Sequence, residues 1–271
     1  MIDSKLNDIL NSHDCDEPAY VISDYMKRNL SRISVLPISE VARACFVSKG
    51  QISKFVKRLG YESYSDFKDS CVEYLEAQEQ KKPIFDAIPD LKKNVMGFTQ
   101  QYIQLLEHIE RNIDYGVLRK LIKDMEGHRE IHLFAQGEAR SICQILQIEL
   151  GNLAIPIGSN NTDFSRPFCY SSDIMILIIS INGRSFSFNK NVMKKILDMP
   201  NDIWVIICSP KVLVSKNKLI VPTTNDKFNE FAMRFAVDII IAQLRQWRSE
   251  KGGAGMKMIE RVSKMETFHP H

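Results

Sequence analysis

Two nearly continuous apolar runs constrain the fold of this chain more than any other feature of its sequence. They are Ile174–Ile179 and Ile203–Ile207. Each run has the length of a strand and lacks alternating polar residues, which is typical of strands buried on both faces of a parallel sheet. Neither run approaches the roughly 18 apolar residues that a membrane span requires. We therefore predict a helix-covered parallel sheet and no membrane segment.

Other strand-like and helical segments surround these two runs in a regular alternation. The predicted strands are residues 130–135, 154–157, 173–180, 202–209 and 218–221, and the predicted helices are residues 139–150, 186–197 and 228–247. Helices of this length are typical of the right-handed crossovers between parallel strands. The predicted fold of this half is an α/β doubly wound parallel five-stranded sheet.

The first 80 residues lack any strand pattern, and their apolar residues recur at helical spacing instead. This periodicity stops near Pro83 and Pro89, as expected where helices end at prolines. We predict an all-α domain over residues 1–80, a linker over 81–106 and the α/β domain over 107–250. The glycines in Lys251–Gly255 predict a flexible joint, and with it a flexible tail over 251–271.

Positive charge is concentrated in the helical half. The whole chain carries a net charge of only +3, but nine basic and three acidic residues lie between Lys27 and Lys68. This segment therefore carries +6, and the rest of the chain carries −3. A small helical unit with such a charge is typical of a domain that binds the phosphates of nucleic acid.

Two helices within this basic segment predict a helix-turn-helix motif. The first begins after Pro37, and the second is capped by Ser48 and ended by Gly60. We predict that the second helix enters DNA, with long cations on phosphates and Gln51 near the base edges. The predicted DNA-binding residues are Ser48, Lys49, Gln51, Ser53, Lys54, Lys57 and Arg58. An ordinary solvated basic face is the alternative, and Phe46 stands in the turn where small residues are common.

The same residues carry a family resemblance. Val47–Ser48, Gln51–Phe55, Lys57–Tyr61 and Ser63–Lys68 resemble the DNA-binding domain of RpiR/MurR-type bacterial transcription regulators over residues 17–75. The resemblance implies a second domain of the sugar isomerase (SIS) type, which agrees with the α/β pattern over residues 107–246. It also implies a double-stranded DNA operator, a homo-oligomer (dimer or tetramer) and a role in carbohydrate metabolism. Because the first residues lack the basic and apolar pattern of a signal peptide, we expect a cytoplasmic location.

Two loops of SIS domains hold a sugar phosphate through hydroxyls and backbone N–H groups at helix N-termini. The second loop is kept here as Ser180–Ser185, but in the first loop Ala135 and Ala139 replace a glycine and the phosphate-binding serine. The effector-binding residues implied by the resemblance are Gly137, Arg140, Ser141, Ser180, Asn182, Gly183, Arg184 and Ser185. A degenerate SIS domain that serves only as a dimerisation scaffold is the alternative.

Other function classes are less well supported by the sequence. A phosphosugar isomerase needs a general base, for which Glu138 and His132 are the nearby residues, but fusion to a helix-turn-helix favours a protein that is not an enzyme. A purely structural interaction protein is a further alternative, to be distinguished by salt-dependent DNA binding. The six cysteines and six histidines are scattered, so we expect reduced thiols, no metal and no cofactor.

Overall fold

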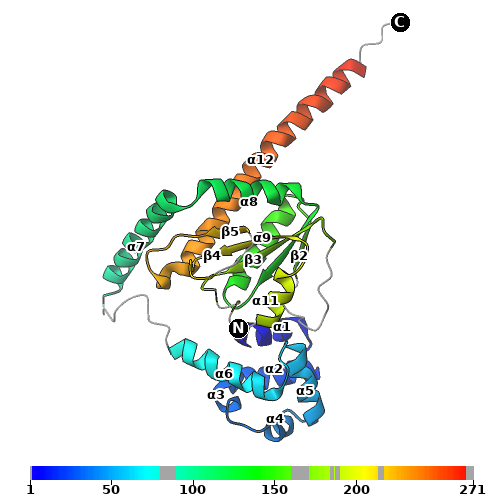
Figure 1. The fold of residues 1–271 in the computed structure, drawn as a ribbon, viewed down its shortest axis with the longest axis vertical. Helices are drawn as coiled ribbons and strands as arrows, with labels where there is room; N and C mark the ends of the chain where they lie inside the picture. Colours follow the sequence, from blue (N-terminus) through cyan, green and yellow to red (C-terminus); the bar gives the residue numbers. More distant parts are fainter. Residues whose placement is uncertain are drawn as a thin grey trace.

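The computed structural model describes residues 2–79, 90–159, 171–183, 186, 190–212 and 217–266. A helical N-terminal half lies beside an α/β C-terminal half (Figure 1). The predicted fold class is confirmed in both halves, because helices alone form the first and a parallel sheet flanked by helices forms the second.

The N-terminal half consists of short helices around one apolar core. They are α1 (Ile2–Ser12), α2 (Pro18–Arg28), α3 (Leu30–Ile33), α4 (Ile38–Ala44), α5 (Lys49–Arg58) and α6 (Tyr64–Glu79). The core buries Met26, Val41, Ile52, Val56 and Phe67, among others. Helices α4 and α5 lie where the helix-turn-helix was predicted, whereas α1 was not anticipated from the sequence.

The C-terminal half is built on one five-stranded sheet. The strands are β1 (Glu130–Ala135), β2 (Ile157–Ser159), β3 (Ile174–Ser180), β4 (Asp202–Ile207) and β5 (Asn217–Ile220). Their order is β2-β1-β3-β4-β5, and all neighbouring strands are parallel. The predicted strand at 154–157 begins later than expected, because Ala154 adopts a positive φ of 53° in a turn closed by its bond to the Gly151 carbonyl.

Helices cover both faces of the sheet and bury its alternate residues. They are α7 (Leu91–Asn112), α8 (Tyr115–Gly127), α9 (Ala139–Asn152), α11 (Lys190–Leu197) and α12 (Asn229–Glu266), with a short η1 (Asp226–Phe228) before the last. Helices α7, α8, α9 and α12 share the larger core with residues such as Leu177 and Trp204. Helix α11 shares the smaller core with Ile176 and Val205, which point to the opposite face.

Two boundaries differ from the sequence prediction. Helix α7 begins at Leu91, and its Leu105 is fully buried in the C-terminal core, so much of the predicted 81–106 linker is part of the α/β half. Helix α12 continues to Glu266 through the glycines where we expected a flexible joint (Figure 1). Each glycine costs a helix about 1 kcal/mol, but good helix formers such as Met256 and Lys257 follow and favour its continuation. Residues 81–89 and 267–271 lie outside the described part of the chain.

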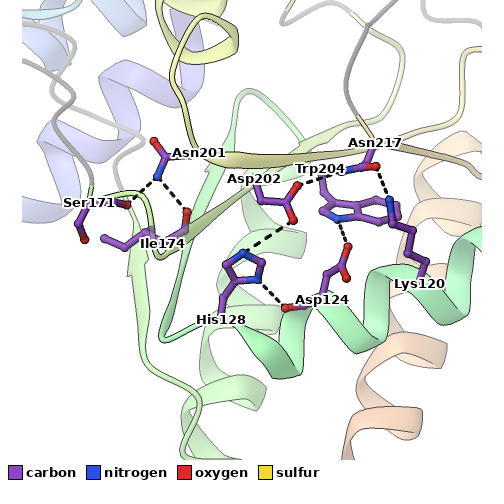
Figure 2. A network of polar contacts seen from close by, with 9 residues as sticks. All are labelled: Lys120, Asp124, His128, Ser171, Ile174, Asn201, Asp202, Trp204 and Asn217. Carbon is purple, nitrogen blue, oxygen red and sulfur yellow. Dashed lines mark hydrogen bonds and ion pairs between the residues drawn. The ribbon is translucent and has the colours of Figure 1, made fainter.

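A polar network joins α8 to the amino ends of β4 and β5 (Figure 2). Trp204 Nε1 donates to Asp124 Oδ2 at 3.0 Å, and Lys120 Nζ donates to Asn217 Oδ1 at 2.7 Å. Asn217 Nδ2 in turn donates to Asp202 Oδ1 at 2.9 Å. These bonds join the helix to β4 and β5, and so fix the sheet from one end. None of the helices in the described part of the chain is both long and apolar enough to cross a membrane.

Candidate DNA-binding and effector sites

Helix α5 is fixed at its start by a capping box. The Ser48 hydroxyl accepts a hydrogen bond from the Gln51 backbone N–H at 3.1 Å, and the Gln51 side-chain oxygen accepts one from the Ser48 N–H at 2.8 Å. This reciprocal pair satisfies two N–H groups that the first turn of a helix otherwise leaves free. It also engages the side-chain oxygen of Gln51 and not its side-chain NH₂ group.

The two faces of α5 differ in burial and in charge. Ile52, Phe55 and Val56 are buried against the other helices of this half. The predicted DNA-binding side chains are exposed, apart from Ser53, which is half-buried. Because α5 contains no acidic residue, its outer face has a uniformly positive charge. Arg58 contacts a side chain outside the helix, with its Nη2 3.2 Å from His13 Nε2.

The turn between α4 and α5 is held by backbone bonds and exposes one aromatic ring. The Val47 N–H donates to the Ala42 carbonyl at 2.9 Å, which closes the turn. Phe46 lies at its apex with a φ of 55°, and 95% of the residue is exposed. The left-handed region is sterically disfavoured for a bulky side chain, so this is a backbone outlier at the entry to α5.

The first predicted effector loop lies between β1 and α9. Gly137 adopts a φ of 59°, and its carbonyl accepts the Arg140 N–H at 3.2 Å. The Ser141 hydroxyl donates to the Glu138 carbonyl at 2.8 Å. Arg140 points to the N-terminal half, where its Nη1 donates to the Ser4 carbonyl at 3.0 Å and pairs with the Asp8 carboxylate. The structure therefore does not bring this guanidinium to the second loop.

The second predicted effector loop follows β3 at the carboxyl end of the sheet. Ser180 is buried, whereas Asn182 is exposed and its Oδ1 accepts a hydrogen bond from Asn229 Nδ2 at 2.6 Å. Gly183 adopts a φ of 75°, and a Cβ there would lie 2.4 Å from Val212 Cγ2, so only glycine fits. Arg184 and Ser185, which were also predicted to bind the effector, lie outside the described residues.

Asn229 is a candidate site residue that the sequence analysis missed. It stands at the start of α12 and is 3% exposed, and its Oδ1 is buried with no partner among the described residues. Buried polar groups are normally hydrogen-bonded, so this acceptor is available to a donor from outside the described residues. Nearby, Cys208 Sγ lies 3.4 Å from the Asn229 carbonyl, and burial raises the pKa of this thiol to about 12. A thiol with such a pKa stays protonated and unreactive at neutral pH.

The residues considered for isomerase chemistry lie in structural surroundings. His132 Nε2 lies 2.8 Å from Glu130 Oε1, and the imidazole packs against Gly158 of β2, where an added Cβ would lie 2.3 Å from the ring. Glu138 stands at the N-cap of α9 without capping it. Within the part of the chain that the structure describes, no group of three His, Cys, Asp or Glu side chains is arranged to hold a metal ion.

Comparisons with known proteins agree with this two-part organisation. Residues 13–78 match the family described as "Helix-turn-helix domain, rpiR family". An uncharacterised HTH-type transcriptional regulator of Providencia stuartii is 22% identical over 194 residues, which cover 69% of this chain and 67% of that protein.

Two solved structures align with this chain, one of them with a TM-score above 0.5. A putative sugar-phosphate isomerase of Listeria monocytogenes has a TM-score of 0.51 at 13% identity, with 59% of this chain and 91% of that chain covered. The Vibrio vulnificus NanR protein complexed with ManNAc-6P has a TM-score of 0.49 at 14% identity, with 98% and 99% covered. At these identities a structural likeness concerns the fold alone.

Proposed function

We propose that this chain is a helix-turn-helix transcription regulator of the rpiR type, in which α5 reads an operator duplex and a sugar phosphate bound by the C-terminal half modulates this binding. The match of residues 13–78 to the rpiR helix-turn-helix family supports this proposal. One observation carries the proposal. It is the capped helix α5, whose apolar face is buried and whose uniformly basic face is exposed. In the chain, this helix is followed by a second, SIS-like domain.

On DNA, the predicted DNA-binding residues of α5 divide into two roles. Lys54, Lys57 and Arg58 reach the phosphates, which supply affinity for any sequence. Lys49, Gln51 and Ser53 stand in the first half of the helix, the part that meets base edges in helix-turn-helix proteins. Two-fold symmetry of a homo-oligomer would require an operator of two related half-sites.

Salt-dependent binding tests these roles, with a duplex selected from a random pool by the protein itself. Lys54→Ala and Lys57→Ala are expected to weaken binding to selected and random duplexes alike, and each to reduce the salt slope by about 1. Lys123→Ala, which removes an exposed cation from α8, serves as the matched control and is expected to bind like the unaltered protein. Gln51→Ala is expected to lower the preference for the selected duplex. Equal losses on both duplexes would contradict the base-reading role.

The effector is proposed to bind at the carboxyl end of the sheet, where open α/β sheets place their ligands. Ser180, Asn182 and Gly183 surround the turn after β3, and Asn229 brings its free acceptor next to Asn182. Hydroxyl and amide groups of this kind fit a phosphorylated sugar. Thermal unfolding with millimolar sugar phosphates is expected to show a raised midpoint, since a ligand of the native state raises stability. The absence of a shift for the whole panel would reject the effector and leave the DNA-binding role intact.

A dimerisation scaffold is the second candidate function of the C-terminal half. It is favoured by Ala139, which stands where the first loop would supply a serine, and by Arg140, whose cation is engaged with α1. A scaffold and a sensor differ in one measurement. The scaffold predicts a homo-oligomer whose duplex affinity is the same with and without the panel of sugar phosphates.

A further inference from the structure

Helix α1 contacts the start of α9, which follows the first effector loop. Arg140 is the second residue of α9, and its guanidinium is bonded to the Ser4 carbonyl and to the Asp8 carboxylate of α1. The side chains of Arg140 and Asp8 are only 14% and 16% exposed, so this pair is shielded from solvent. The Arg140 Nε is buried and has no partner among the described residues, so the guanidinium is not fully satisfied.

The same helix contacts the end of the recognition helix. Lys5 is 5% exposed, its Nζ donates to the Leu59 carbonyl at 2.8 Å, and it lies 4.3 Å from the centre of the Tyr61 ring. Leu59 is the C-cap of α5, where the last carbonyls of a helix need donors. Burial lowers the pKa of Lys5 to about 7. Helix α1 thus joins the last turn of α5 to the first turn of α9 through the neighbouring residues Ser4, Lys5 and Asp8.

We propose that α1 transmits effector binding to the recognition helix, because the phosphate of an effector competes with the Asp8 carboxylate for Arg140. This proposal rests on the proposed function for its two ends, the effector and the operator. A phosphate group offers three acceptor oxygens to the fork of donors on an arginine, whereas Asp8 leaves one of those donors unpaired. Displacement of Asp8 frees α1 and alters the support of α5. The two sites are then coupled through one bistable contact.

The decisive variant is Asp8→Asn, which opens the ion pair without an effector. Its duplex affinity is expected to differ at least about 3-fold from that of the unaltered protein, in the direction that glucose 6-phosphate produces. Its remaining response to glucose 6-phosphate is expected to vanish. Asp3→Asn removes the same charge from the same helix but disturbs a bond to Asn7 instead of the pair with Arg140, so it is the matched control. Asp8→Asn that behaves like Asp3→Asn would overturn the proposal.

Hydrogen exchange gives a readout that requires neither DNA nor effector. Asp8→Asn and Lys5→Met are each expected to speed amide exchange in residues 59–61 at the end of α5, and Asp3→Asn is not. Unchanged exchange in Asp8→Asn would reject the link even if the protein binds both operator and effector. Conversely, a full-length protein that binds no duplex would reject the proposed function, while faster exchange in the variant would still support the link.

A second inference rests independently on the turn before α5. Phe46 combines a φ of 55° with 95% exposure, and it lies two residues before the Ser48 cap. The chain gains no core contact from this ring in its present place, yet bears the steric cost of a bulky residue in the left-handed region. Backbone outliers of this kind concentrate at functional sites. We infer that Phe46 contacts the DNA that α5 binds, through apolar contact with a thymine methyl or a sugar.

Substitution of Phe46 by glycine separates the backbone strain of this residue from its contribution to duplex binding. This test again rests on the proposed function. Phe46→Gly is expected to raise the thermal midpoint by about 2–4 °C, because glycine accepts the positive φ, and to weaken duplex binding about 5-fold or more. Phe46→Leu, which keeps an apolar side chain, is expected to retain more of the affinity than Phe46→Gly does.

Val35→Ala removes another exposed apolar side chain from the same half, and it is expected to change neither property. If Phe46→Gly binds as tightly as the unaltered protein while Lys54→Ala does not, the inference fails and the proposed function stands. If neither substitution weakens binding, both fail.

Discussion

The two ends of the parallel sheet are built from the same strands but differ in how their polar groups are used. At the amino end, side chains of β4 and β5 bond to those of α8, as in the pairs Trp204–Asp124 and Asn217–Lys120 (Figure 2). At the carboxyl end, the loop after β3 reaches α12 through the bond between Asn182 and Asn229. The first end is therefore a structural anchor. At the second end, a buried acceptor of Asn229 has no partner among the described residues.

One asparagine at each end makes the contrast sharper. Asn201 and Asn229 both bury an Oδ1 that has no partner among the described residues. The amide of Asn201 donates to two backbone carbonyls, those of Ser171 and Ile174, at 2.8 and 2.9 Å (Figure 2). The amide of Asn229 donates to the exposed side chain of Asn182. Backbone partners hold Asn201 in place, whereas the partner of Asn229 is an exposed side chain.

The largest expected effect concerns the amino end. Trp204 is 1% exposed, so Trp204→Ala is expected to lower the free energy of unfolding by about 3–5 kcal/mol through lost burial and a cavity. Trp204→Phe keeps most of the apolar volume but loses the bond to Asp124, and is expected to cost about 1–2 kcal/mol. Urea unfolding followed by circular dichroism measures both. A Trp204→Ala protein as stable as the unaltered chain would contradict an anchoring role for this end.

A smaller loss is expected at the carboxyl end from Gly183→Ala. The positive φ costs a residue with a Cβ about 1–2 kcal/mol, and the new methyl group would overlap Val212. Thermal unfolding should therefore show a lower midpoint. The double substitution Gly183→Ala with Val212→Ala serves as the control, because it removes the overlap and keeps the strain. The loss caused by Gly183→Ala is measured in the unaltered protein and in the Val212→Ala variant. If the two losses are equal, the close approach to Val212 is not the cause.

The fold of the C-terminal half was predictable because double burial leaves a clear mark on a sequence. Strands such as β3 and β4 are apolar at nearly every position, since both of their faces meet helices. The edge strand β2 is only three residues long and contains Gly158, so its pattern was weak and its start was predicted too early. The helix-turn-helix was predictable for a related reason, because Ser48 and Gly60 mark the ends of one amphipathic helix.

Contacts between distant parts of the chain were not predictable in this way. The pair of Asp8 and Arg140 joins residues 132 positions apart, and periodicity and capping describe only near neighbours. Arg140 was expected to bind an effector directly, because the sequence shows its place beside a loop and not the direction of its side chain. Helix α1 was missed because the sequence offers it no conspicuous cap. Asn229 was missed because burial, which makes its free acceptor notable, is a property of the fold.

The two asparagines test the contrast most directly, and the smallest expected loss of stability in this comparison is that of Asn229→Ala. Asn201→Ala is expected to lower the free energy of unfolding by about 1–3 kcal/mol, because two backbone carbonyls lose their donor. Asn229→Ala removes one bond but also the unpaired Oδ1, so it is expected to cost less than about 1 kcal/mol. Urea unfolding of the two variants under one set of conditions gives the comparison.

The variants Asn201→Ala and Asn229→Ala are also expected to differ in their response to a ligand. In thermal unfolding with millimolar sugar phosphates, Asn229→Ala is expected to lose the ligand-induced rise of the midpoint, whereas Asn201→Ala keeps it from a lower starting point. This outcome follows if the carboxyl end holds its polar groups for a ligand and the amino end uses them for the fold. Equal stability losses, or a full ligand response in Asn229→Ala, would show that the two ends do not differ in the way their hydrogen bonds suggest.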